Sequence, residues 1–245
     1  MQSVNHSSRL LGFAFLLQAV TSLVSGAVFL KPLLVADDIN ATMTKIADNP
    51  LLLRASIFGD VITAIGIVFL GAVLLVCLRQ QHETFAFIAF GLYIFEAGLL
   101  AASRVAAFSL LRISETFVTS GQPAALQASA TVTLETMNFG YTLHMLPFCV
   151  GGMLFYYLLY KANLVPRLMT LWGLVTIPPM LIGTLLVIAG NTAPTYLYIP
   201  YIPFEFVIGL WILVRGIKHH AALNQPQVAV TTIDMNKPSR LTGNI

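Results

Sequence analysis

Residues 51–78 read LLLRASIFGDVITAIGIVFLGAVLLVCL, an apolar run in which only Arg54 and Asp60 carry a charge. A helix needs about 20 predominantly apolar residues to cross the hydrocarbon core of a bilayer. This run exceeds that length, and the polar sequence RQQHE follows it directly. The segment therefore predicts a transmembrane helix that ends at a short turn.

The composition of the whole chain agrees with a membrane environment. Of its 245 residues 57% are hydrophobic and 9% are charged, whereas soluble domains carry about 25% charged residues. A chain so poor in charge cannot cover a surface that faces water, so the lipid bilayer is its predicted partner. The net charge is +3 and no basic cluster is interleaved with aromatic residues, which argues against nucleic acid as a partner.

Apolar segments of similar length recur along the chain and predict an all-α, polytopic membrane protein, a six-transmembrane-helix bundle. The C-terminal stretch has few large apolar residues and no sustained period, which predicts a disordered cytoplasmic tail at 221–245. Residues 1–220 then form one transmembrane domain, with spans at about 10–34, 51–78, 84–111, 134–160, 168–189 and 195–214.

The first span resembles a signal peptide because Arg9 precedes its apolar run. The run is longer than the 7–15 apolar residues typical of a signal peptide, so an uncleaved span is predicted. After it, Ile39, Met43 and Ile46 recur at i, i+4 and i+7. This spacing predicts a short amphipathic helix at the membrane interface, with a plain polar loop as the alternative. The stretch 112–133 reads as a soluble loop.

The distribution of basic residues predicts the orientation, because cytoplasmic loops carry an excess of Lys and Arg. With the amino terminus inside, six basic residues lie at inner span ends and four at outer ones. Both termini are therefore predicted to be cytoplasmic. The inner set is Arg9, Arg79, Lys161, Arg167, Arg215 and Lys218, and the outer set is Lys31, Lys45, Arg54 and Arg112.

Polar side chains within the spans are the candidate site residues, because a charge at the bilayer centre costs about 2.5–3.5 kcal/mol on insertion scales. In the predicted topology the charged and histidine members all lie between the midplane and the outer surface, which predicts a polar pocket that opens outward. The candidates for ligand binding or ion pairing are Asp60, Glu96, Arg104, Glu205, His144, Arg54, Glu135 and Asn138.

Helix geometry suggests how these residues are partnered. Glu96 and Arg104 are eight residues apart, about 80° around a helix, so they do not form a direct i, i+4 pair. Arg104 is expected to meet Asp60 or Glu205 from another span. For this group, structural stabilisation and a ligand or proton site both remain open.

Span four carries a polar stripe on one face and a histidine on another. Glu135, Asn138 and Thr142 fall at i, i+3 and i+7, which places them on the same face of a helix. His144 is either a packing residue or a member of the site.

Prolines interrupt the last two spans. Pro178 and Pro179 are expected to kink the fifth. Pro203 suits a first helical position, with Glu205 in the first turn. The helix from Pro203 onward is too short to cross the bilayer, so a kinked or unwound outer half is predicted for the sixth span. Such broken segments recur where transporters bind substrate. The tyrosines of this stretch instead fit an aromatic belt: Tyr196, Tyr198 and Tyr201.

Motifs for catalysis are missing from the sequence. One membrane histidine cannot build a three-histidine zinc site, and no nucleophile elbow, HExxH or phosphate-binding glycine motif is present. We therefore assign no catalytic residue, metal or cofactor. Acid–base work by Asp60, Glu96 or Glu205 is the remaining enzymatic possibility. Cys77 and Cys149 lie far apart in apolar segments and are expected to be packing residues.

Two stretches resemble signatures of a bacterial multi-pass membrane family, the domain-of-unknown-function 4386 family. They are LLYKANLVPRLM at 158–169 and EFVIGLWILVRG at 205–216. The resemblance implies a six-span protein of the bacterial inner membrane and transfers no catalytic residue. It does favour a role for Glu205, which matches a glutamate of the family.

Three functions are consistent with these observations. The first is binding or transport of a small solute or proton through the polar pocket. The second is a non-transporting accessory or sensor protein whose buried charges are structural. The third is an intramembrane acid–base enzyme. We favour the first, because the charges gather on one side and the sixth span is broken.

Overall fold

The computed structural model describes residues 2–217, and the predicted disordered tail at 221–245 lies outside the described residues. Seven α-helices account for most of the described chain, and it contains no β-strand. The helices are α1 (Gln2–Leu23), α2 (Ile39–Asp48), α3 (Pro50–Leu78), α4 (Glu83–Thr119), α5 (Ala124–Ala162), α6 (Arg167–Ile188) and α7 (Ile202–Arg215).

Six helical segments are long and apolar enough to cross a membrane, which confirms the all-α six-span prediction. Four of them coincide with α3, α4, α5 and α6. The first and last are composite, because a π-helix η1 (Val24–Leu30) and a 3-10 turn η2 (Lys31–Leu33) extend α1, and two 3-10 turns precede α7. The composite spans cover Arg9–Leu33 and Thr195–Arg215.

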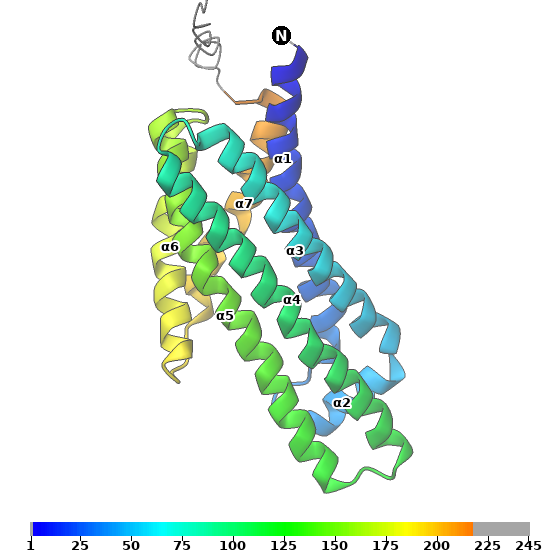
Figure 1. Cartoon of the computed structure of the whole chain (residues 1–245). Helices are drawn as coiled ribbons and strands as arrows, with labels where there is room; N and C mark the ends of the chain where they lie inside the picture. Colours follow the sequence, from blue (N-terminus) through cyan, green and yellow to red (C-terminus); the bar gives the residue numbers. More distant parts are fainter. Residues whose placement is uncertain (1, 218–245) are drawn as a thin grey trace, which may run out of the picture.

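The helices form a bundle with two distinct ends (Figure 1). The amino end of the chain, the carboxyl end of α7 and the α3–α4 and α5–α6 turns lie together at one end, which we call the terminal end. Helix α2 and the α4–α5 turn lie at the opposite end, which we call the α2 end.

Helices α4 and α5 extend well past the length that a membrane requires. They contain 37 and 39 residues, or about 56 and 58 Å at 1.5 Å per residue, against a hydrocarbon core of about 30 Å. The prediction of a loop at 112–133 was therefore wrong, because only Ser120–Pro123 separates the two helices. Gly121 and Gln122 make that turn with φ angles of 78° and 62°.

The extended parts of α4 and α5 pack with α2 around a core of their own, the α2 cluster. The predicted short helix exists, and the Asp38 carboxylate caps it by accepting a hydrogen bond from Ala41 N at 2.9 Å. Met43 and Ile46 of its apolar stripe are buried against other helices of the protein, and its location at the membrane interface stays a prediction. The fully buried members of the cluster include Met43, Ile46, Leu53, Leu110, Leu111, Phe117 and Ala130.

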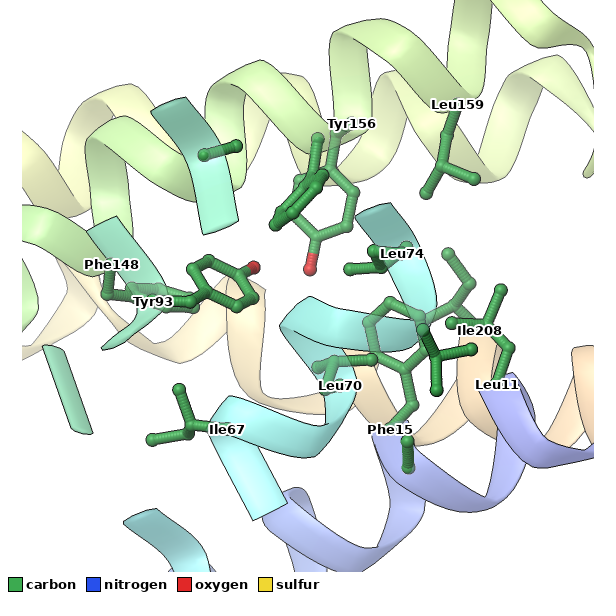
Figure 2. Packing of buried hydrophobic residues seen from close by; sticks show 14 of the residues in the cluster. Leu11, Phe15, Ile67, Leu70, Leu74, Tyr93, Phe148, Tyr156, Leu159 and Ile208 are labelled. Carbon is green, nitrogen blue, oxygen red and sulfur yellow. The ribbon is translucent and has the colours of Figure 1, made fainter. Parts of the chain in front are cut away.

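A larger apolar core fills the rest of the bundle, and Figure 2 shows part of it. Tyr93 of α4 and Tyr156 of α5 are among its largest fully buried side chains. Gly12 allows α1 to lie directly against α7, because a Cβ atom there would collide with the backbone nitrogen of Leu213. Small residues at helix contacts are typical of membrane bundles, where close packing drives association.

The sixth span is broken as predicted. Two 3-10 turns, η3 (Thr195–Leu197) and η4 (Ile199–Tyr201), precede α7, whose 14 residues reach only about 21 Å. The Trp172 indole of α6 donates a hydrogen bond to the Pro200 carbonyl at 3.1 Å, so it supports the broken backbone. Pro178 and Pro179 lie inside α6, where the loss of two backbone donors is expected to bend the helix.

Candidate functional site

A cavity of about 530 Å³ lies among α1, α3, α4, α5, α6 and the broken sixth span. Its volume falls within the range of about 300–1,000 Å³ that is typical of small-molecule sites. Apolar side chains form most of its wall, with a few polar groups among them. The polar groups that line it include Gln18, Ser22, Thr63, Glu96, Tyr141, His144, Tyr201 and Glu205.

Glu96 is the most exceptional of these polar groups. It projects from the middle of α4 and is 4% exposed. Its Oε2 atom is buried and has no hydrogen-bond partner among the described residues. A buried polar atom without a partner is uncommon because its desolvation is not compensated. Glu96 therefore lines the cavity and carries a buried oxygen atom that is unsatisfied among the described residues.

Glu205 lies in the first turn of α7, next to the break in the sixth span. Its Oε1 atom accepts a hydrogen bond from the Tyr201 hydroxyl at 3.0 Å. That hydroxyl lies 2.7 Å from the hydroxyl of Tyr156. Because Tyr201 has one hydroxyl hydrogen, which it donates to Glu205, Tyr156 is the donor to Tyr201. The chain of three side chains links α5 to α7 and holds one face of the Glu205 carboxylate.

His144 reaches the cavity from α5. It is buried, and its Nδ1 atom has no hydrogen-bond partner within the described part of the chain. The imidazole lies edge-on to the ring of Tyr141, with 4.6 Å between ring centroids. It therefore adds a second unsatisfied polar atom to the wall that Glu96 lines.

Arg104 and Asp60 form a separate buried pair. Arg104 Nη1 lies 2.8 Å from Asp60 Oδ2. The guanidinium also donates to the Ser103 hydroxyl, from Nε at 3.0 Å and Nη2 at 2.8 Å. Neither charged residue lines the cavity. The Arg104 guanidinium instead lies over the Tyr141 ring, at 5.7 Å from its centroid, and Tyr141 lines the cavity.

The structure therefore divides the predicted group in two. Of the two partners expected for Arg104, Asp60 is the one that it contacts, whereas Glu205 bonds to Tyr201. Glu96, Glu205 and His144 line the cavity together. As predicted from helix geometry, Glu96 and Arg104 make no ion pair with each other in the described chain.

The other candidates lie away from the cavity. Arg54 is exposed and lies 3.8 Å from Glu115, which also pairs with Arg112. These charges belong to the α2 end of the bundle. Glu135 and Asn138 lie on an exposed face of α5 and do not line the cavity. Of the polar stripe predicted for span four, Glu135 and Asn138 are therefore surface residues, whereas Thr142 lines the cavity.

Sequence reasoning missed several contributors to the site, and Gln18 and Tyr201 are two of them. Gln18 is buried and lines the cavity from α1. It is the single side-chain amide in the first predicted span, and this could have identified it as a candidate. Tyr201 was considered as a member of an aromatic belt, yet it is buried. Only Tyr196 of the three belt candidates is exposed, and no pattern in the sequence separates it from Tyr201.

Helical rise places the cavity residues along the bundle. At about 1.5 Å per residue, Glu205 lies about 15 Å from the last residue of α7, and Glu96 lies about 20 Å from the first residue of α4. His144 lies about 27 Å from the last residue of α5 by the same measure. These residues therefore lie about 15–27 Å along their helices from the terminal end of the bundle, in the direction of the α2 end. Within residues 9–217, no cluster of three or more His, Cys, Asp or Glu side chains has the geometry of a metal site.

The chain matches no curated protein and no solved structure. A family model, the domain of unknown function DUF4386, matches residues 10–216. The match includes all six candidate spans almost completely, as well as every residue that lines the cavity. The chain therefore belongs to the DUF4386 family of multi-pass membrane proteins.

Proposed function

We propose that this protein binds a small solute or a proton in the cavity among its membrane helices, and that it carries this ligand across the membrane or senses it there. The observation that carries the proposal is the unpartnered Oε2 atom of Glu96 at the cavity wall. Desolvating a polar group without a compensating hydrogen bond costs several kcal/mol in an apolar medium. A ligand that supplies a donor would remove this cost.

The broken sixth span supports the proposal. Backbone that leaves the α-helix at membrane depth is tolerated where it meets protein or a water-filled cavity. Here Tyr198 and Tyr201 of the broken segment line the same cavity as Glu205. Membrane transporters place substrates at comparable interruptions. We assign a structural role to the Asp60–Arg104 pair, because its two charges contact each other.

The orientation is part of the proposal. Arg79, Lys161, Arg167 and Arg215 lie near the terminal end, and we place this end in the cytoplasm because basic residues favour that side. The cavity then opens towards the outside of a bacterial inner membrane. Cysteines introduced singly at Gln80 and Ser120, which are exposed at the two ends, test this with a membrane-impermeant maleimide. We expect Ser120→Cys to be labelled in intact cells and Gln80→Cys only after lysis.

Accessibility of the cavity tests whether a solute enters it. In a Cys77→Ala/Cys149→Ala background, Ser22→Cys places a thiol on the cavity wall with almost no change in volume. Ser114→Cys is the matched control, because Ser114 is fully buried and does not line the cavity. We expect the small neutral reagent methyl methanethiosulfonate to modify Ser22→Cys rapidly and Ser114→Cys slowly. Equal, slow modification of both would refute the proposal.

Proton flux in proteoliposomes then distinguishes transport from binding alone. We expect Glu205→Gln and Glu96→Gln proteins to remain folded and to lose any flux that the unaltered protein shows. Glu83→Gln, an exposed residue of the same helix as Glu96, serves as the control. An accessible cavity without flux would favour the sensor over the transporter.

A further inference from the structure

The cavity has an excess of acidic side chains. Glu96 and Glu205 both line it, and its wall includes no lysine or arginine. Their surroundings differ, because Glu205 accepts a hydrogen bond from Tyr201 whereas the Oε2 atom of Glu96 accepts none within the described residues. Glu96 therefore lines the cavity with a carboxyl group whose buried Oε2 atom receives no donor from the described residues.

Arg104, whose guanidinium lies over the ring of a cavity residue, is not available to neutralise this carboxylate. Arg104 contacts Asp60 at 2.8 Å and donates twice more to Ser103. Its guanidinium lies over one side of the Tyr141 ring, and Tyr141 lines the cavity. The positive charge of Arg104 is therefore matched by Asp60, and the two cavity glutamates have no cation of their own.

Aromatic rings surround the remaining space. The cavity wall contains five of them, alongside methionine and aliphatic side chains. The faces of aromatic rings attract cations, by about 0.5–1 kcal/mol at exposed sites and about 2 kcal/mol or more where the cation is desolvated. The five rings are Tyr141, Phe148, Tyr198, Tyr201 and Phe206.

From these observations we propose that the solute is a small organic cation, an ammonium group carried on an apolar body. This inference rests on the proposed function and specifies its ligand. The ammonium would donate to Glu96 Oε2, with the Nδ1 atom of His144 as a second polar contact, and the apolar body would lie among the aromatic rings. A cavity of about 530 Å³ accommodates a molecule of this kind. An anion would be repelled by both glutamates.

Reaction rates with charged thiol reagents test the preference. The probes are 2-(trimethylammonium)ethyl methanethiosulfonate, a permanent cation, and 2-sulfonatoethyl methanethiosulfonate, a permanent anion. Each is applied to Ser22→Cys in the cysteine-free background, and the exposed Ser120→Cys is the reference. Clefts lined by one sign of charge raise the local concentration of counter-ions by about 10–1,000-fold. We expect the cation-to-anion rate ratio at Ser22→Cys to exceed that at Ser120→Cys by about tenfold or more.

Neutral variants show whether the glutamates cause the preference. Glu96→Gln and Glu205→Gln should each lower the ratio at Ser22→Cys, and the double variant should bring it to the Ser120→Cys value. Glu83→Gln should leave it unchanged. A ratio equal to the reference, or one that the double variant does not alter, overturns the cation assignment. Methyl methanethiosulfonate separates the two ideas, since failure of this neutral reagent to reach Ser22→Cys would refute the proposed function itself.

Discussion

The guanidinium of Arg104 on α4 contacts the carboxylate of Asp60 on α3 at 2.8 Å, and both side chains are almost completely buried. The contact connects two helices that are consecutive in sequence, near the junction between the large core and the α2 cluster. By helical rise, Asp60 lies about 27 Å from the last residue of α3. The pair therefore lies far from the terminal end of the bundle, where it connects α3 to α4.

Loss of one partner of this pair should be strongly destabilising. We expect Arg104→Met to lower the free energy of unfolding by about 3–5 kcal/mol, because it leaves a buried carboxylate without its cation. Chemical denaturation of the purified protein in detergent provides the measurement. Asp60→Leu combined with Arg104→Met should recover much of the loss. The control is Arg112→Met, which removes an exposed pair with Glu115 and should cost less than about 1 kcal/mol. An unaffected Arg104→Met protein would contradict this role.

The hydrogen-bonded chain from Tyr156 through Tyr201 to Glu205 should stabilise the break in the sixth span. Tyr201→Phe removes the hydroxyl that contacts both neighbours. The expected cost is about 1–3 kcal/mol of unfolding free energy, since a buried acceptor and a buried hydroxyl both lose a partner. Tyr196→Phe, at an exposed position of the same segment, should change stability by less than about 0.5 kcal/mol. Equal effects of the two substitutions would show that these hydrogen bonds contribute nothing to stability.

The contact between α1 and α7 should depend on Gly12. A Cβ atom at Gly12 would collide with the backbone of Leu213, and backbone atoms cannot rotate away as a side chain can. We expect Gly12→Ala to destabilise the protein by about 1–3 kcal/mol, which is typical of overpacking. Gly91 is the matched control in α4, because a Cβ atom there meets nothing within 4 Å. Gly91→Ala should be neutral or stabilising by up to about 1 kcal/mol. Thermal unfolding of both variants in detergent checks the prediction, which similar melting temperatures would refute.

The α2 cluster should unfold locally when its core is weakened. Ile46 is fully buried in this cluster, so Ile46→Ala is expected to cost about 2–5 kcal/mol. Hydrogen exchange should then rise within residues 39–48, while α6 and α7 remain protected. Lys45→Ala, at an exposed position of the same helix, should leave exchange unchanged. Faster exchange throughout the bundle would instead show that the α2 cluster and the large core unfold together.

Much of the architecture was predictable because hydrophobic length is a local property. Each span is recognisable in the sequence as a run of about 20 mainly apolar residues. The short apolar run after Pro203 also predicted the break before α7. The stretch 112–133 was wrongly predicted to be a loop, because its polar residues suggested a segment exposed to water. In the structure both flanking helices continue through it, and their apolar residues such as Phe117 and Ala130 are buried against α2. That burial depends on a partner distant in sequence.

In the candidate site, too, some features were predictable from the sequence and others depended on packing. The sequence alone identified four charged residues as unusual, because placing a charge in the hydrocarbon core costs free energy unless the charge is paired or hydrated. They are Asp60, Glu96, Arg104 and Glu205. Helix periodicity also indicated that Glu96 and Arg104 do not pair with each other. Which residue Arg104 contacts, and which carboxylate lacks a partner, follows from the rotation and packing of helices that are far apart in the sequence.

The six membrane spans and the costly polar groups within them can be recognised from the amino-acid sequence without a structure. This follows from local composition, since the bilayer selects apolar segments of fixed length whatever lies elsewhere in the chain. The pairing of Asp60 with Arg104, and the shared cavity of Glu96 and Glu205, emerge when the helices pack together. The physical reason is that a side chain's partner depends on how its helix is rotated and packed against the others.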